Sequence, residues 1–267
     1  MTSFLSCINK DRLEFIRTRK NLICLLVLLA CAAMVLLSTA FMPALLDRAM
    51  EVTDLMSKDM SISDFMAKFF PYDLKGSLGI FSSDIGIFYS LTIIVMTYSL
   101  MPNEISTGRL ILPLCAGHSK NALFFSKQCV YGILCAIPVF PIYVMYYYIG
   151  VGFLANNYSF SSALFNALLW VIAEFSVVFF TIGLSVLYRH RFMSLASMGI
   201  LIMIAPDILS FFKFGKYFPT YILTYLYSSN EDPSSLVIPV ALIVVLMIIM
   251  DFIIVNKHFS VEVDERR

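Results

Sequence analysis

The sequence predicts an all-α integral membrane protein, and three observations carry that prediction. Hydrophobic residues make up 60% of the 267 positions, against about 45–50% in soluble domains. Charged residues make up only 14%, against about 25% in soluble domains. The apolar residues form long continuous runs without strict alternation, which excludes a membrane β-barrel and leaves helices as the spanning elements. We therefore expect a single transmembrane domain over residues 1–267.

A helix needs ~20 apolar residues to cross the hydrocarbon core of a bilayer. Six segments of the sequence meet that requirement, and we expect six transmembrane helices. The first of them follows a basic lead-in, as the core of a signal peptide does. At about 20 residues it is longer than the roughly 7–15 residues of such a core, so we interpret it as a membrane helix. The predicted spans are 22–42, 79–101, 123–149, 163–187, 193–212 and 236–255.

The distribution of Lys and Arg indicates the orientation, because cytoplasmic loops carry an excess of both. With the N-terminus in the cytoplasm, the larger share of these residues falls inside, including those of the short basic loop 188–192. Both termini are then cytoplasmic, segment 43–78 is extracellular and segment 102–122 is a cytoplasmic loop. We expect a multi-pass protein of the cell membrane (the bacterial inner or plasma membrane), surrounded by lipid and with no nucleic acid among its partners.

Residues 1–21 are expected to form a cytoplasmic amphipathic lead into the first span. Apolar residues at positions 4, 5, 8, 15 and 16 fall roughly on one helical face, and Arg12 interrupts that face. This pattern is typical of a helix that lies in the membrane interface. The alternative is a solvated basic tail that fixes the topology.

Two segments are assigned to the outer side. In segment 43–78, apolar residues at helical spacing (Ile62, Phe65, Met66 and Phe69) indicate two short helices on the outer surface, and a solvated connector is the alternative. Segment 213–235 is rich in Tyr and Phe, so we expect an outer interfacial or re-entrant segment.

The third predicted span contains two prolines, and it ends in a run of tyrosines. Pro138 and Pro141 each remove a backbone donor, so we expect a kink there. Tyr143 and residues 146–148 are expected to form an aromatic belt at the outer interface.

The sequence contains no motif for catalysis or for metal binding. None of its six Cys residues forms a C-x-x-C pair, and its three His residues lie far apart in the chain. It also lacks the G-x-x-x-x-G-K-[ST] loop that binds nucleotide phosphates. We therefore expect neither catalytic residues nor a metal site, and no hydrolysis of ATP by this chain itself.

Glu174 is the acidic residue nearest the middle of a predicted span. A charge at that depth costs ~3 kcal/mol or more, so such residues are usually functional or buried between helices. Three interpretations remain open. Glu174 lines a substrate path, lies at a helix or subunit contact as a neutral or hydrogen-bonded acid, or faces a solvated vestibule.

The cytoplasmic loop 102–122 and the start of the next span carry a distinctive series of residues. Glu104 precedes Gly108, a leucine-rich turn follows, and Ser119 and Lys120 come before Lys127. This series resembles the loop between the second and third spans of ABC-2 type transporter permeases. There an acid, a Gly, a leucine-rich turn, a Pro-x-Ser-Arg-like tetrad and a later Lys follow one another.

The sequence departs from that pattern at two positions. Gly117 stands where the family has Pro, and Pro113 interrupts the leucine-rich turn. The predicted six spans, cytoplasmic termini, amphipathic lead and outer segment 213–235 are all similar to the layout of the family. The resemblance therefore covers essentially the whole chain.

The resemblance implies a permease subunit of an ATP-driven exporter, which moves an amphipathic peptide, drug or lipid-like substrate outward or across leaflets. Its implied partners are two copies of a separate ABC ATPase and a second permease subunit, identical or different. ATP and Mg would be bound by the ATPase, and this chain would need no cofactor. The residues that it assigns to coupling with the ATPase are Glu104, Gly108, Arg109, Ser119, Lys120 and Lys127.

Two other classes of function compete with this interpretation. An ion-coupled secondary transporter would use Glu174 as its proton or cation site, although such folds usually show an internal repeat. A membrane module that transports nothing is the third class. Retention of transport after ATP depletion would distinguish the secondary transporter, and failure to co-purify with an ATPase would favour the third class.

Overall fold

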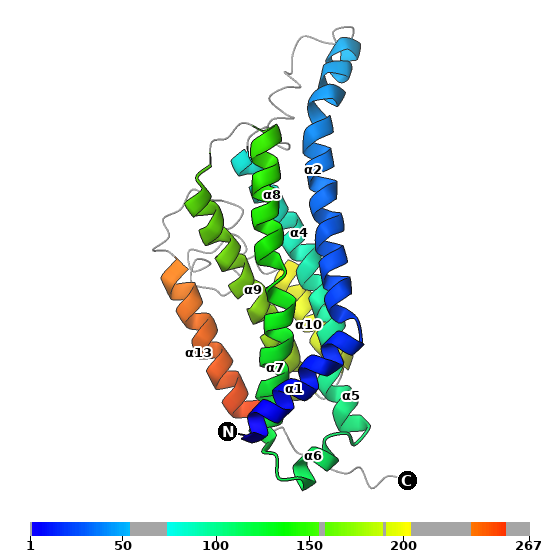
Figure 1. Ribbon diagram of the computed structural model, residues 1–267, viewed down its shortest axis with the longest axis vertical. Helices are drawn as coiled ribbons and strands as arrows, with labels where there is room; N and C mark the ends of the chain where they lie inside the picture. Colours follow the sequence, from blue (N-terminus) through cyan, green and yellow to red (C-terminus); the bar gives the residue numbers. More distant parts are fainter. Residues whose placement is uncertain (1, 54–73, 155–157, 189–190, 204–235, 255–267) are drawn as a thin grey trace.

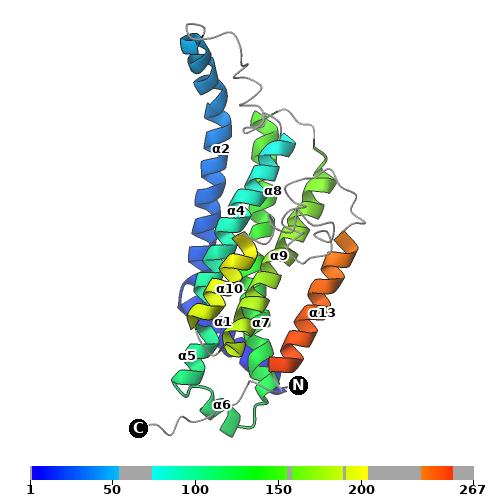
Figure 2. The same ribbon diagram turned by 180° about the vertical axis from the view of Figure 1, so that it is seen from behind.

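The computed structural model describes the chain except for residues 1, 54–73, 155–157, 189–190, 204–235 and 255–267. Every regular element in the described part is a helix, which confirms that the protein is all-α. Two views of the bundle show long, roughly parallel helices with a shorter helix, α1, crossing near one end (Figure 1 and Figure 2).

The first helices of the described chain are α1 (Thr2–Arg17), α2 (Lys20–Thr53), α4 (Leu74–Thr97) and α5 (Leu100–Ser106). Those that follow are α6 (Ile111–Cys115), α7 (Lys120–Ala136), α8 (Val139–Phe153), α9 (Phe160–Leu187), α10 (Arg191–Met203) and α13 (Val237–Ile253).

Four helical units of the described chain are long enough and apolar enough to cross a membrane: Lys20–Thr39, Leu74–Ser106, Lys120–Phe153 and Phe160–Leu187. They correspond to the first four predicted spans. Two shorter apolar helices, Phe192–Met203 and Ile238–Ile253, lie within the last two predicted spans. Residues 204–212, the rest of the fifth predicted span, lie outside the described part.

Helix α2 is longer than the sequence predicts. The first span was expected to end near residue 42, yet the helix continues to Thr53. Strong helix formers follow Pro43 (Ala44, Leu45 and Leu46), and membrane helices tolerate proline. Helix α4 likewise begins at Leu74, so both ends of segment 43–78 are parts of long helices. The helix expected around residues 62–69 lies outside the described part, as do segment 213–235 and the C-terminus.

The expected break in the third span is confirmed. Helix α7 ends at Ala136, and α8 begins at Val139, directly after Pro138. Pro138 has no N–H to donate, so the helical ladder is interrupted at this point. Pro141 lies in the first turn of α8, where a missing N–H costs no intrahelical bond.

Helix α9 lies at the centre of the bundle and contacts α4, α5, α7, α8, α10 and α13. In the N-terminal half of α9, Trp170 is fully buried against aromatic side chains of α4 and α8. The Phe81 ring lies 5.3 Å from Trp170, and the Tyr143 ring lies 5.9 Å from it, both edge to face. Phe81 also stacks on Tyr146 at 4.3 Å.

The predicted aromatic belt is therefore wrong for most of its members. Tyr143, Tyr146 and Tyr147 are buried, and Tyr148 alone of the four is well exposed. Positions 143, 146 and 147 share one face of a helix, and here that face packs into the bundle.

The N-terminal helix α1 is confirmed as a helix, with a different buried face from the one expected. Cys7, Asp11 and Phe15 face inward against α7, whereas Leu13 and Ile16 are exposed. Contacts from Cys7 to His118 and from Lys10 to Glu104 place α1 against the loop 102–122. The N-terminus and this loop therefore lie at the same end of the bundle (Figure 1).

Candidate functional site

The loop 102–122 contains two short helices, each closed by a glycine. Helix α5 ends in a turn where the Arg109 N–H donates to the Glu104 carbonyl and the Gly108 N–H donates to the Ile105 carbonyl. This pair of bonds is the Schellman motif, which requires a left-handed residue at its centre. Gly108 has a φ of 67°, so a glycine at this position is explained by backbone geometry.

Helix α6 ends in the same way. The His118 N–H donates to the Pro113 carbonyl and the Gly117 N–H donates to the Leu114 carbonyl, with a φ of 86° at Gly117. Pro113 is the third residue of α6, a position whose N–H has no intrahelical partner. The two departures from the permease pattern, Gly117 and Pro113, thus both fit the local helix geometry.

Ser119 begins the next helix. Its side chain accepts a hydrogen bond from the Ala122 N–H at 3.2 Å, which makes it the N-cap of α7. An N-cap of this kind contributes ~1 kcal/mol to helix stability. Ser119 is therefore accounted for by local structure.

The six residues assigned to coupling fall into two groups. Arg109, Ser119 and Lys120 are exposed, and Gly108 is half-buried. Glu104 and Lys127, in contrast, are buried and bound to each other: Lys127 Nζ donates to Glu104 Oε1 at 2.8 Å. The structure thus brings this pair together inside the chain and leaves the others at the surface of the loop.

Lys127 lies at the centre of a cluster of charged groups from three helices. Its Nζ is 3.5 Å from Asp11 Oδ1 and 3.7 Å from Glu14 Oε2, both on α1, in addition to Glu104 on α5. The Ser126 hydroxyl donates to Asp11 Oδ2 at 2.6 Å. We call Asp11, Glu14, Glu104, Ser126 and Lys127 the Lys127 cluster.

The surroundings of the Lys127 cluster are largely closed to water. Burial raises the pKa of Asp11 above its usual value, although the Lys127 ammonium and the Ser126 hydroxyl both act to lower it. Lys127 Nζ also lies 5.6 Å from the centre of the Tyr131 ring, and the Phe15 ring packs edge to face against Tyr131 at 5.1 Å. Cation–π contact of this kind favours a buried ammonium.

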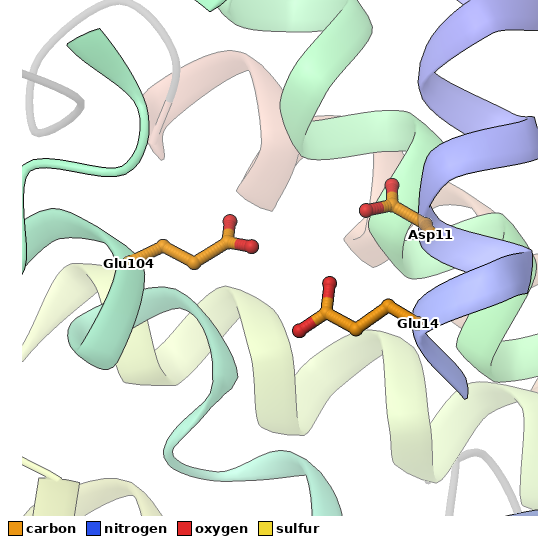
Figure 3. A group of neighbouring side chains, drawn as sticks. All are labelled: Asp11, Glu14 and Glu104. Carbon is orange, nitrogen blue, oxygen red and sulfur yellow. The ribbon is translucent and has the colours of Figure 1, made fainter. Parts of the chain in front are cut away.

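The three acids of the cluster point toward one another from α1 and α5 (Figure 3). One oxygen of each lies within 4.8 Å of the others, a spacing that a metal ion could use. Because Lys127 Nζ is within 4 Å of an oxygen of Asp11, Glu14 and Glu104, its ammonium already supplies a cation to this group. The geometry therefore indicates an ion-pair cluster in preference to a metal site.

We expect Ser126→Ala to weaken the cluster measurably. The substitution removes the hydroxyl that donates to buried Asp11, and hydrogen bonds to charged groups contribute ~1.5–3 kcal/mol. The free energy of unfolding in mixed micelles, followed by far-UV circular dichroism, should fall by that amount. Ser197→Ala is the matched control, because among the described residues the Ser197 hydroxyl donates to the Ser194 carbonyl of its own helix. Equal stability of the two variants would contradict the assignment.

Glu174 corresponds to the second of its three interpretations, a hydrogen-bonded acid at a helix contact. Its side chain is fully buried between α9 and α4. Trp170 Nε1 donates to Oε1 at 2.9 Å, and the Ser90 hydroxyl lies 3.0 Å from both carboxylate oxygens. Each oxygen thus has a donor within the chain.

A further polar contact joins α7 to α13. Gln128 Nε2 donates to Asp251 Oδ1 at 3.1 Å and to the Phe179 carbonyl at 3.3 Å. Gln128 and Asp251 are both buried. This contact fixes α13 against the bundle at the level of the Lys127 cluster.

Asp11, Glu14 and Ser126 were missed by the sequence reasoning. A weak signal was present, because Cys7, Asp11, Glu14 and Phe15 share one face of a helix. Lys127 also lies inside an apolar run, where an ammonium requires a partner. The chain matches no family model and none of the curated proteins.

Proposed function

We propose that this chain is the permease subunit of an ATP-driven exporter of the ABC-2 type. In this proposal α10 and α13 belong to the fifth and sixth spans, and the end of the bundle with α1, α5 and α6 faces the cytoplasm. A pair of separate ATPase subunits binds ATP and Mg there, and a second permease subunit completes the transporter. The cargo is amphipathic, in the class of peptides, drugs or lipid-like molecules.

The observation that carries the proposal is the apolar tip of α6. Leu112 is 78% exposed, the largest exposure among the bulky apolar side chains of the described residues. Ile111 beside it is also exposed, while Leu110, the residue before α6, is buried and packs against the rest of the protein. An exposed apolar pair on a short, polar loop between two spans favours docking into a groove of a partner protein.

The base of the loop is connected to the spans in a way that suits coupling. Glu104, at the end of α5, is bound to Lys127 on α7, and Lys127 is bound to Asp11 on α1. A displacement of α6 by a moving partner would therefore reach α7 and α1 through a rigid, buried contact. Coupling requires such an element between two sites.

We expect Leu112→Asp to uncouple the transporter. A buried hot-spot side chain contributes 2 kcal/mol or more to an interface, so a carboxylate in its place should lower the affinity for the ATPase by at least ~10-fold. Two measurements report the loss: co-purification with a co-expressed ABC ATPase, and ATP-dependent uptake of a fluorescent lipophilic cation into inverted vesicles, whose lumen corresponds to the outside of the cell. Asn103→Asp is the control, because it adds the same carboxylate at another exposed position of the loop.

Two outcomes would overturn the proposal. Export that survives ATP depletion and collapses with a protonophore would assign the chain to ion-coupled transport. Absence of any stable complex between the wild-type chain and an ABC ATPase in mild detergent would assign it to the modules that transport nothing. Wild-type complex formation by Leu112→Asp would overturn the assignment of α6 alone.

A further inference from the structure

Three sulfur-bearing side chains from three helices lie inside the bundle, and Cys135 follows Lys127 by about two turns of α7. Cys24 on α2 and Cys135 on α7 are both fully buried. Cys24 Sγ lies 3.7 Å from the Met96 sulfur on α4, and the Cys24 and Cys135 thiols form a hydrogen-bonded pair. We call Cys24, Met96 and Cys135 the sulfur cluster.

The distance between Cys24 Sγ and the Met96 sulfur fits two ligands of one metal ion. Metal–thiolate bonds of about 2.3 Å place two sulfur ligands of one ion roughly 3.8 Å apart, close to the distance between Cys24 and Met96. Thiolate and thioether ligands are soft and select Cu(I) among the biological metals. Structural Zn²⁺ sites have four ligands, so a three-sulfur cluster suits Cu(I) better.

The charges around the sulfur cluster also fit a monovalent ion. Two thiolates and one Cu(I) carry a net charge of −1, which a buried site must compensate. Lys20 provides the positive charge: its Nζ donates to the Met96 carbonyl at 3.1 Å and interacts electrostatically with the Cys24 thiol. Lys20, on α2, can therefore compensate the net negative charge of the metal site.

Tyr89 completes the surroundings of the sulfur cluster. Its hydroxyl donates to the Cys135 carbonyl at 2.5 Å and hydrogen-bonds the Cys24 thiol. Contacts of this kind orient metal ligands and contribute to affinity without touching the ion.

We propose that Cys24, Met96 and Cys135 form a binding site for Cu(I). One Cu(I) ion replaces the two thiol protons, which are released to solvent, and the oxidation state of every partner stays unchanged. The bound ion joins α2, α4 and α7. This inference is independent of the proposed transport function, because it concerns a site inside the bundle and needs no ATPase.

The test is a titration of the purified full-length chain with Cu(I) in detergent, under reducing conditions and in competition with a chromophoric Cu(I) chelator. We expect one tightly bound equivalent. Cys24→Ser and Cys135→Ser should each lower the affinity at least ~100-fold, since loss of an outer contact alone costs 10–100-fold. Cys31→Ser and Cys129→Ser are matched controls, because these half-buried cysteines lie on the same two helices. Both controls should bind as the wild type does.

A measurement on the wild-type chain keeps the proposal testable if the serine variants fail to fold. X-ray absorption of the Cu(I)-loaded protein should show sulfur ligands only, and the melting temperature should rise with Cu(I). Nitrogen or oxygen ligands in that spectrum would overturn the proposal. A loss of affinity smaller than about tenfold in folded Cys24→Ser or Cys135→Ser would overturn it as well.

Discussion

Replacing Lys127 by Met should produce the largest loss of stability in the charged part of the molecule. The substitution removes the cation shared by Asp11, Glu14 and Glu104. Asp11 and Glu104 are then left buried with no compensating charge from α7. Removal of one partner from a buried ion pair costs ~3–5 kcal/mol, and we expect a loss of that size in the free energy of unfolding.

The measurement is reversible unfolding in mixed micelles, and Arg12→Met is the matched control. Arg12 lies on the exposed side of α1, so its loss removes the same charge type with little effect, because exposed pairs contribute about 0–1 kcal/mol. The double variant Lys127→Met with Glu104→Gln should recover part of the loss, since one stranded carboxylate is removed. A double variant no more stable than Lys127→Met alone would contradict the pairing of Lys127 with Glu104.

The same substitution separates a positioning role from a docking role. Lys127 is 1% exposed and bound within the chain, so a change there should shift α5 and α6 without altering the surface that a partner meets. Under the function proposed above, we therefore expect Lys127→Met to weaken stimulation of the ATPase less than Leu112→Asp does, at a temperature where both variants remain folded.

The all-α fold could be predicted from the sequence because few backbone conformations satisfy their hydrogen bonds in lipid. Long apolar runs must be helical in a bilayer, and the first four spans were placed to within a few residues at most of their ends. The break at Pro138 was also predictable, since a missing N–H acts locally. The end of α2 was not predictable in this way. Apolar content indicates which residues can lie in the hydrocarbon core, but a helix can continue beyond that core.

The candidate site could be predicted only in part. Glu104 and Lys127 were singled out because one segment resembles a loop of the ABC-2 permeases, whereas Asp11 joins them from a helix that precedes the first predicted span. Pairing between residues so far apart in the sequence depends on tertiary packing. The apolar face predicted for α1 did not include Asp11. The tyrosines of α8 show the same limit: a belt and a buried face have identical composition, and only the packing against Phe81 and Trp170 distinguishes them.

Truncation of Trp170 to Ala should be the most damaging change in the apolar interior. Trp170 is fully buried, and its edge-to-face contacts with Phe81 and Tyr143 would be replaced by a cavity. Such truncations cost ~3–5 kcal/mol. The substitution also removes the N–H that donates to Glu174 Oε1. Among the described residues, the Ser90 hydroxyl then remains as the donor to that carboxylate.

Trp170→Phe separates the two contributions, because it keeps most of the ring volume and removes the donor. We expect it to cost ~1–3 kcal/mol, the penalty for an unmet buried polar group, and so less than Trp170→Ala. Phe165→Ala is the control: it truncates an aromatic residue of the same helix that is 40% exposed. Unfolding is followed by circular dichroism, because the chain has one Trp and its variants lose the fluorescence signal. If Trp170→Ala is as stable as Phe165→Ala, the aromatic contacts of Trp170 with Phe81 and Tyr143 do not hold α4, α8 and α9 together.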